Sequence, residues 1–150
     1  MATIHLFRPA VLAMVLLQAC GAASAALTDR TAGGIGFVEG GIGIDEVQAL
    51  DEQRSRYPLA LRMAALRSGA YLADVHLTIT DAAGSVIFDR QLQAPWLLIE
   101  LKPGRYELVG VCEGNVQRLV VVVPARGHRE AVMYFAVPGE MSPRRVDADR

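Results

Sequence analysis

Apolar and polar residues alternate with a period of two over most of the chain after residue 58. In the clearest run, Tyr71, Val75 and Ile79 would point to one side, and Asp74 and Thr78 to the other. Such alternation is typical of a strand with one buried face. Further runs that predict strands occupy residues 59–64, 85–89, 95–101, 106–112, 116–123 and 128–137, and the run at 116–123 is apolar on both faces. Short strands at regular intervals predict a mainly β fold, an antiparallel sandwich of about seven strands.

Turn sequences separate several of these runs. They are Asp-Ala-Ala-Gly at 81–84, Lys-Pro-Gly-Arg at 102–105 and Glu-Gly-Asn at 113–115. Glycine adopts the positive φ that tight turns need, and proline fixes φ in advance. We therefore expect each turn to join two neighbouring antiparallel strands.

One segment, about 46–57, has helical periodicity. Asp45 is suited to the N-cap position, Gln48 lies at the capping-box spacing, and Pro58 would end the helix. One face of this helix carries Val47, Leu50, Arg54 and Tyr57. We expect the helix to pack on the β domain through that face.

Residues 1–25 have the pattern of a signal peptide. Arg8 gives a positive start, 10–17 is an apolar run, and Ala23-Ser-Ala25 is a cleavage signal. The run is too short to span a bilayer, which needs about 20 apolar residues. We therefore expect export to the periplasm, followed by a flexible tether at 26–36, a sandwich domain at 37–137 and a disordered tail at 138–150.

Residues 17–21, Leu-Gln-Ala-Cys-Gly, resemble the lipobox of bacterial lipoproteins. The resemblance implies lipidation of Cys20 and an anchor in the outer membrane, which would be the protein's one contact with a membrane. Ordinary cleavage after Ala23 or Ala25 is the alternative, and both readings stay open. In either case Cys112 has no intramolecular partner, and its apolar surroundings favour a buried structural role.

The charge pattern and the polar residues exclude several classes of function. The chain has 15 Lys and Arg against 16 Asp and Glu, so nothing favours nucleic-acid binding. His76 and His128 lie on separate predicted strands, and no spacing of ligands indicates a metal. We expect no catalytic residues, no metal and no cofactor, and we classify the protein as a non-enzyme.

Residues 101–108, Leu-Lys-Pro-Gly-Arg-Tyr-Glu-Leu, resemble the L-x-P-G-x-Y-x-L signature of carboxypeptidase regulatory-like and transthyretin-like (prealbumin-like) domains. The strand before 81–84 and the strand after it match the same pattern. Blocks at 40–46, 68–75 and 94–97 are similar to small exported proteobacterial proteins with this domain. The resemblance spans about residues 36–136 and implies a prealbumin-like β-sandwich. The hydroxyisourate hydrolases of this fold carry a Tyr-Arg-Gly-Ser tetrapeptide that the chain lacks.

Together these features predict a non-enzymatic envelope protein, an accessory or protein-interaction module. Its partner would be another envelope protein, which would contact a strand edge or the Gly-rich and helical segment. The alternative is a carbohydrate-binding module of the periplasm or cell surface. The residues expected to contribute to a ligand or partner surface are Trp96, Tyr71 and Tyr134, although core packing is the commoner role for Trp96.

The leader generates the first testable prediction. In cells, the mature protein lacks at least residues 1–19, because the leader is removed on export. Intact-mass measurement with and without globomycin separates the two readings. Acylated Cys20 at the N-terminus indicates a lipoprotein, whereas a start at Ser24 or Ala26 indicates ordinary cleavage. A chain that keeps Met1 would contradict export.

Overall fold

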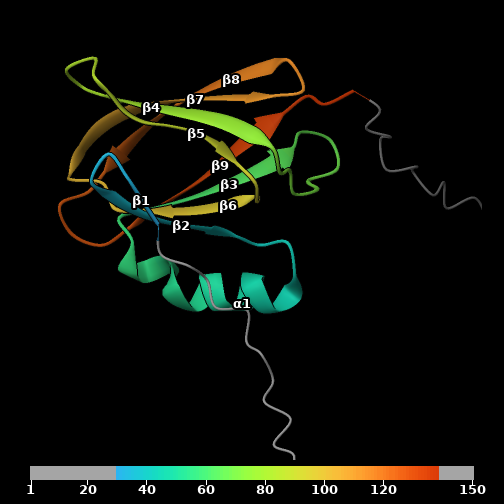
Figure 1. The fold of residues 1–150 in the computed structure, drawn as a ribbon, viewed down its shortest axis with the longest axis horizontal. Coiled ribbons are helices and arrows are strands. Elements are labelled where there is room, and N and C mark those ends of the chain that lie inside the picture. The colour runs from blue at the N-terminus through green and yellow to red at the C-terminus, as the bar shows by residue number, and fades with distance from the viewer. Residues whose placement is uncertain (1–29, 139–150) are drawn as a thin grey trace, which may run out of the picture.

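The computed structural model describes residues 30–138, which form three layers (Figure 1). A helical layer covers part of one face of a five-stranded sheet, and a four-stranded sheet packs on the other face. The prediction of a mainly β fold with one short helix is confirmed. Residues 1–29 and 139–150, which include the predicted signal peptide and Cys20, lie outside the described residues. No helix within 30–138 is both long and apolar enough to cross a membrane.

The two sheets contain more strands than the sequence pattern indicates. The five-stranded sheet has the order β1 (Arg30–Ala32), β2 (Ile35–Gly40), β6 (Trp96–Ile99), β3 (Leu59–Ala65) and β9 (Arg129–Phe135). The four-stranded sheet has the order β5 (Val86–Leu92), β4 (Val75–Asp81), β7 (Gly104–Cys112) and β8 (Asn115–Val123). Strands β1 and β2 are additional to the seven runs, and β1 lies where we expected the tether.

One strand pair departs from the antiparallel expectation. Strand β9 runs parallel to β3, with Leu59 opposite Arg129 and Ala65 opposite Phe135. Strand β8 forms an edge of the four-stranded sheet, and the chain crosses from it to the other sheet before β9 begins. A tight hairpin requires antiparallel pairing, whereas a connection that crosses between sheets permits either direction. Parallel pairing of β9 with β3 is therefore compatible with this connection.

The main core lies between the two sheets and explains the alternation. Leu61 and Met63 of β3 face the inside of the sandwich, as do Leu77 and Ile79 of β4, and all four are fully buried. Cys112 is also buried in this core, as predicted. Burial of alternate side chains from both sheets gives the two layers a common apolar interior.

A second, smaller core lies between the five-stranded sheet and helix α1 (Ile44–Gln53), which continues as the 3-10 helix η1 (Arg54–Arg56). Its buried residues are Val38, Leu50, Ala60, Trp96 and Leu98, with Val47 and Tyr57 against them. The predicted apolar helix face is therefore confirmed. Since β3 and β6 have apolar neighbours on both sides, nearly all their residues are buried.

The helix begins differently from the prediction. Gly43 is the N-cap and has no side-chain capping bond, so the assignment of Asp45 to that position is wrong. Instead the Glu46 carboxylate accepts hydrogen bonds from the backbone N–H of Gly41 at 3.0 Å and Ile42 at 3.2 Å. A glutamate in the first turn can reach backwards in this way, so it fixes the chain that leads into the helix and places a negative charge near the helix N-terminus.

The predicted turn at 81–84 is confirmed in detail. The Asp81 carboxylate accepts hydrogen bonds from the backbone N–H of Ala83 and Ser85, each at 2.9 Å. Gly84 has a φ of +84°, which favours glycine. At the next corner, the Tyr106 hydroxyl donates to the Lys102 carbonyl at 2.8 Å. The motif at 101–108 thus acts as a structural corner.

The close contact of the sheets at Gly110 generates a stability prediction. A methyl group at this position would overlap Met133 Sδ and the Phe135 ring. We expect Gly110→Ala to lower the free energy of unfolding by about 1–3 kcal/mol, as overpacking does. Urea unfolding measures this change in the free energy of unfolding. Val109→Ala, on the outer side of the same strand, should have less effect, and equal effects would contradict the assigned facing of β7.

Candidate ligand-binding surface

Helix α1 covers only part of the outer face of the five-stranded sheet. Beside the covered part lies a depression of about 320 Å³. Its lining residues are Arg62, Ala64, Gly69, Tyr71, Val132 and Tyr134. It therefore contains two of the three aromatic residues that the sequence indicates as a ligand or partner surface.

The parallel pairing of β3 and β9 assembles this depression. Arg62 lies opposite Val132, and Ala64 lies opposite Tyr134. Tyr71 joins them through an isolated bridge to Ala64. The strand predicted from residue 71 begins only at Val75, so Tyr71 does not enter the sandwich core. Tyr71 and Tyr134 are 49% and 47% exposed.

Trp96 lies beneath this surface and is only 3% exposed. Its ring meets Tyr71 edge-to-face, with centroids 6.0 Å apart, and the Arg62 guanidinium is 5.0 Å from its centre. On another side Gly41 is so close that a Cβ there would overlap the indole. The structure thus brings all three predicted residues together. Trp96 has no open face for a sugar, and it supports the two side chains that contact it.

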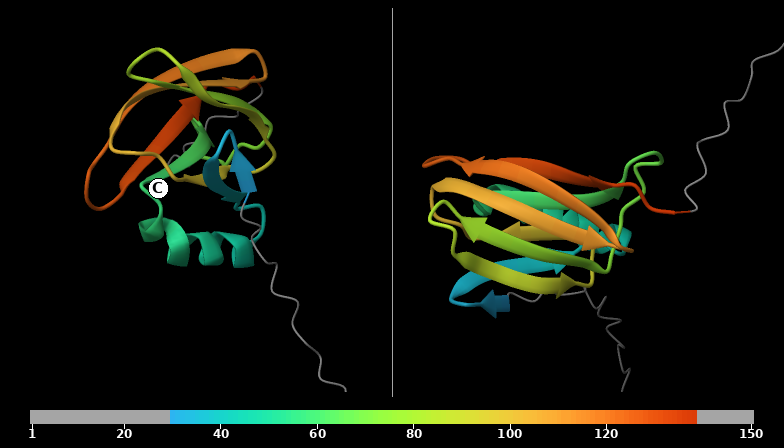
Figure 2. Two further views of the ribbon diagram at one scale, coloured as in Figure 1. Left: turned by 60° about the vertical axis from the view of Figure 1, so that its left-hand side comes forward. Right: turned by 90° about the horizontal axis from the view of Figure 1, so that it is seen from above.

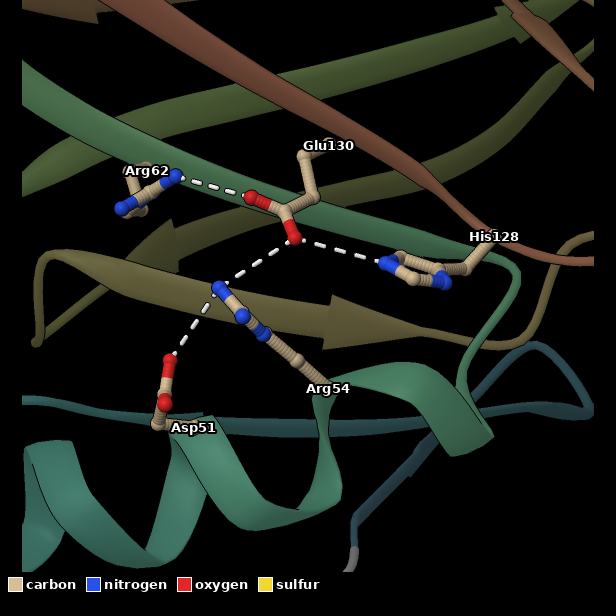
Figure 3. A network of polar contacts seen from close by, with 5 residues as sticks. All are labelled: Asp51, Arg54, Arg62, His128 and Glu130. Carbon is tan, nitrogen blue, oxygen red and sulfur yellow. Dashed lines mark hydrogen bonds and ion pairs between the residues drawn. The ribbon is translucent and has the colours of Figure 1, made fainter.

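A polar network holds Arg62 in place (Figure 3). Glu130 contacts Arg62 at 3.0 Å, Arg54 at 3.3 Å and His128 at 3.3 Å, and Arg54 also contacts Asp51 at 3.2 Å. Each contact is partly solvated and individually weak, but a shared carboxylate restricts several side chains at once. The network links η1, β3 and β9, and sequence reasoning missed it because Arg62 and Glu130 are 68 residues apart.

The two histidines do not converge. His76 lies on the outer face of the four-stranded sheet, where it contacts Asp89 at 2.6 Å and Thr78 donates to the same oxygen at 3.3 Å. His128 belongs to the network around Glu130, on the other sheet. Within residues 30–138 no three His, Cys, Asp or Glu side chains are grouped as metal ligands would be.

A larger cavity, of about 600 Å³, lies at one end of the sandwich. It includes Asp81, Glu100, Lys102 and Tyr106. The Asp81 carboxylate is engaged in its turn, and the Tyr106 hydroxyl in its corner. Size favours this cavity, but it contains no half-exposed aromatic side chain like Tyr71 or Tyr134. The smaller depression, with exposed tyrosines and a positioned arginine, is the better candidate site.

The outer face of the four-stranded sheet forms a second surface, which we call the valine face. Val116, Val120 and Val122 on β8 are 52%, 47% and 59% exposed. In the register of β7 and β8, Val111 lies opposite Val116 and Val109 opposite Arg118. No other element of residues 30–138 covers this face (Figures 1 and 2).

Comparisons with known proteins do not assign a family. No family model matches the chain, and no curated protein matches it. Among solved structures, a crystal structure of S.CueP is similar, with a TM-score of 0.42 and 12% sequence identity. The match covers 51% of this chain and 62% of that one. A structural similarity this low gives no evidence about function.

The thiol of Cys112 provides a prediction. Burial raises its pKa above the ordinary 9.0, and Glu113 and Asp74 raise it further. In a chain starting at residue 26, Ellman's reagent at about pH 8 should therefore react slowly until urea unfolds the protein. Fast reaction of the folded chain would contradict burial.

The same shift predicts the pH dependence of stability. The folded state holds the thiol proton of Cys112 more tightly than the unfolded state does. The contribution of this thiol to the free energy of unfolding is therefore fully present below about pH 9, and it is lost as pH rises through the folded-state pKa. Urea titrations between pH 8 and 11 should show a smaller decline for Cys112→Ala than for the parent chain.

Proposed function

We propose that the protein is an exported, non-enzymatic module of the bacterial envelope that binds another envelope protein through the valine face. The observation that carries this proposal is the row of half-exposed valines on β8. Monomeric proteins rarely expose several large apolar side chains close together, and such groups of side chains often mark interaction sites. The outer face of the other sheet is partly covered by the protein's own helix. The valine face lacks such cover within residues 30–138.

The chemistry of the valine face defines its partner. Val120 and Val122 form a short apolar segment at one end of the row, and Val116 lies at the other end, opposite Val111. Arg118 lies between Val116 and Val120 in the same row and contacts Glu107 at 3.4 Å. A charged pair within an apolar row adds specificity of orientation more than affinity. We therefore expect a protein partner with apolar groups on either side of a polar group.

Two finer assignments belong to this proposal. The corner at 101–108 and the two-sheet architecture support a prealbumin-like domain related to the carboxypeptidase regulatory-like group. The leader pattern supports a periplasmic address, with a lipid anchor if Cys20 is acylated. Non-enzymatic action is supported by the separation of the two histidines, because His76 lies on the four-stranded sheet and His128 lies beside Glu130 on the five-stranded sheet.

Site-specific crosslinking tests the valine face. A photo-crosslinking amino acid at position 120 should give one discrete adduct with another envelope protein in living cells. The same amino acid at Glu52, an exposed position on α1, is the matched control and should not give that adduct. Val116→Lys should weaken the adduct from position 120 several-fold, because a charge at a buried interface is costly.

Three outcomes would contradict the proposal. One is an equal adduct from positions 52 and 120, which would show no preference for the valine face. Another is the absence of an adduct from position 120 when the protein is folded and exported. The third is an adduct formed only with a second copy of the chain, which would show self-association.

A further inference from the structure

We propose that the depression between Tyr71 and Tyr134 binds a sugar ring that carries a carboxylate, of the hexuronic acid class. This site lies on the five-stranded sheet, whereas the proposed protein contact uses the four-stranded sheet. The inference therefore goes beyond the proposed function and can be tested independently of it.

The size and lining of the depression suit one sugar ring. Two tyrosine rings, each about half exposed, line it with the small side chains of Ala64 and Val132. Aromatic rings offer an apolar face to the C–H groups of a sugar and a hydroxyl to its oxygens. A volume of about 320 Å³ is near the lower limit of small-ligand pockets. It suits a single ring better than an extended peptide.

Arg62 indicates the charge of the ligand, because no other lining residue of the depression is charged. Glu130 accepts a hydrogen bond from Nη2 of Arg62. That bond uses one N–H of Nη2. A guanidinium group carries five N–H donors that form two parallel pairs, and one bond from Nη2 occupies at most one pair, so the other pair can bind a ligand carboxylate. A neutral sugar would offer it only the weaker bonds of hydroxyl groups.

The surroundings of Arg62 hold it ready for such a ligand. The Trp96 ring lies under the guanidinium and Glu130 fixes one end, so little side-chain freedom is lost on binding. Glu130 does not make the region acidic, since its carboxylate also contacts Arg54 and His128. The whole network contains two carboxylates, from Glu130 and Asp51, and they contact two guanidinium groups and an imidazole. An anionic sugar therefore meets no excess of negative charge.

Calorimetric titration of the mature protein with trigalacturonate, a trimer of hexuronic acid units, tests the inference. The methyl ester of trigalacturonate, a neutral trimer with the same ring configuration, is the matched ligand control. We expect saturable binding of trigalacturonate and at least about tenfold weaker binding of the ester, because a hydrogen bond to a charged group contributes enough free energy for such a ratio. Arg62→Gln and Tyr134→Ala should each weaken trigalacturonate binding by about tenfold or more. Tyr134→Phe should retain most of it, because the ring remains.

A matched protein control is present on the opposite sheet. Arg118, like Arg62, pairs with one glutamate, although its side chain is more exposed, and Arg118→Gln should bind trigalacturonate like the parent chain. Circular dichroism confirms that each variant is folded. The inference is overturned if folded parent chain does not bind trigalacturonate, or if both trimers bind equally. It is also overturned if Arg62→Gln and Tyr134→Ala bind normally, or if Arg118→Gln loses as much affinity as Arg62→Gln. Val116→Lys, which affects the proposed protein contact, should leave sugar binding unchanged.

Discussion

The double burial of β3 and β6 is the constraint on which the rest of the structure depends. These strands have the interior of the sandwich on one side and the helix layer on the other. Leu61 of β3 faces inwards to the second sheet, whereas Ala60 faces outwards to Leu50 of α1. A sheet buried on both faces needs an apolar residue at nearly every position, and these two strands supply it.

This arrangement decides which surfaces are left for binding. The helix is short, so it covers Trp96 and Leu98 of β6 but leaves Val132 and Tyr134 of β9, on the far side of β3, uncovered. The four-stranded sheet has no such cover over Val120 within the described residues. We therefore place both binding proposals on outer sheet faces, where the core does not use the side chains. The core side chains lie beneath these faces, and we expect them to make no contact with a ligand or partner.

The sequence predicts the local features well and the long-range ones poorly. The strand at 59–64 and the Asp-Ala-Ala-Gly turn depend on neighbouring residues, and both are confirmed, although β3 is buried on both faces and not on one. The parallel pairing of β9 with β3 depends on a crossing between sheets, which no local pattern encodes. The contact of Arg62 with Glu130 follows from that pairing, so it could not be foreseen. The aromatic residues Trp96, Tyr71 and Tyr134 were identified from type alone, and the fold places them together with Trp96 underneath.

The fluorescence of Trp96, the one tryptophan in the chain, tests the layered arrangement most directly. Its indole lies between the sheet and the helix and supports Arg62 and Tyr71. The account predicts emission at short wavelength in the folded protein, with little quenching by iodide, and full quenching after unfolding. Long-wavelength emission that iodide quenches in the folded protein would show that Trp96 is open to solvent, and would contradict both the helix layer and the candidate site built on it.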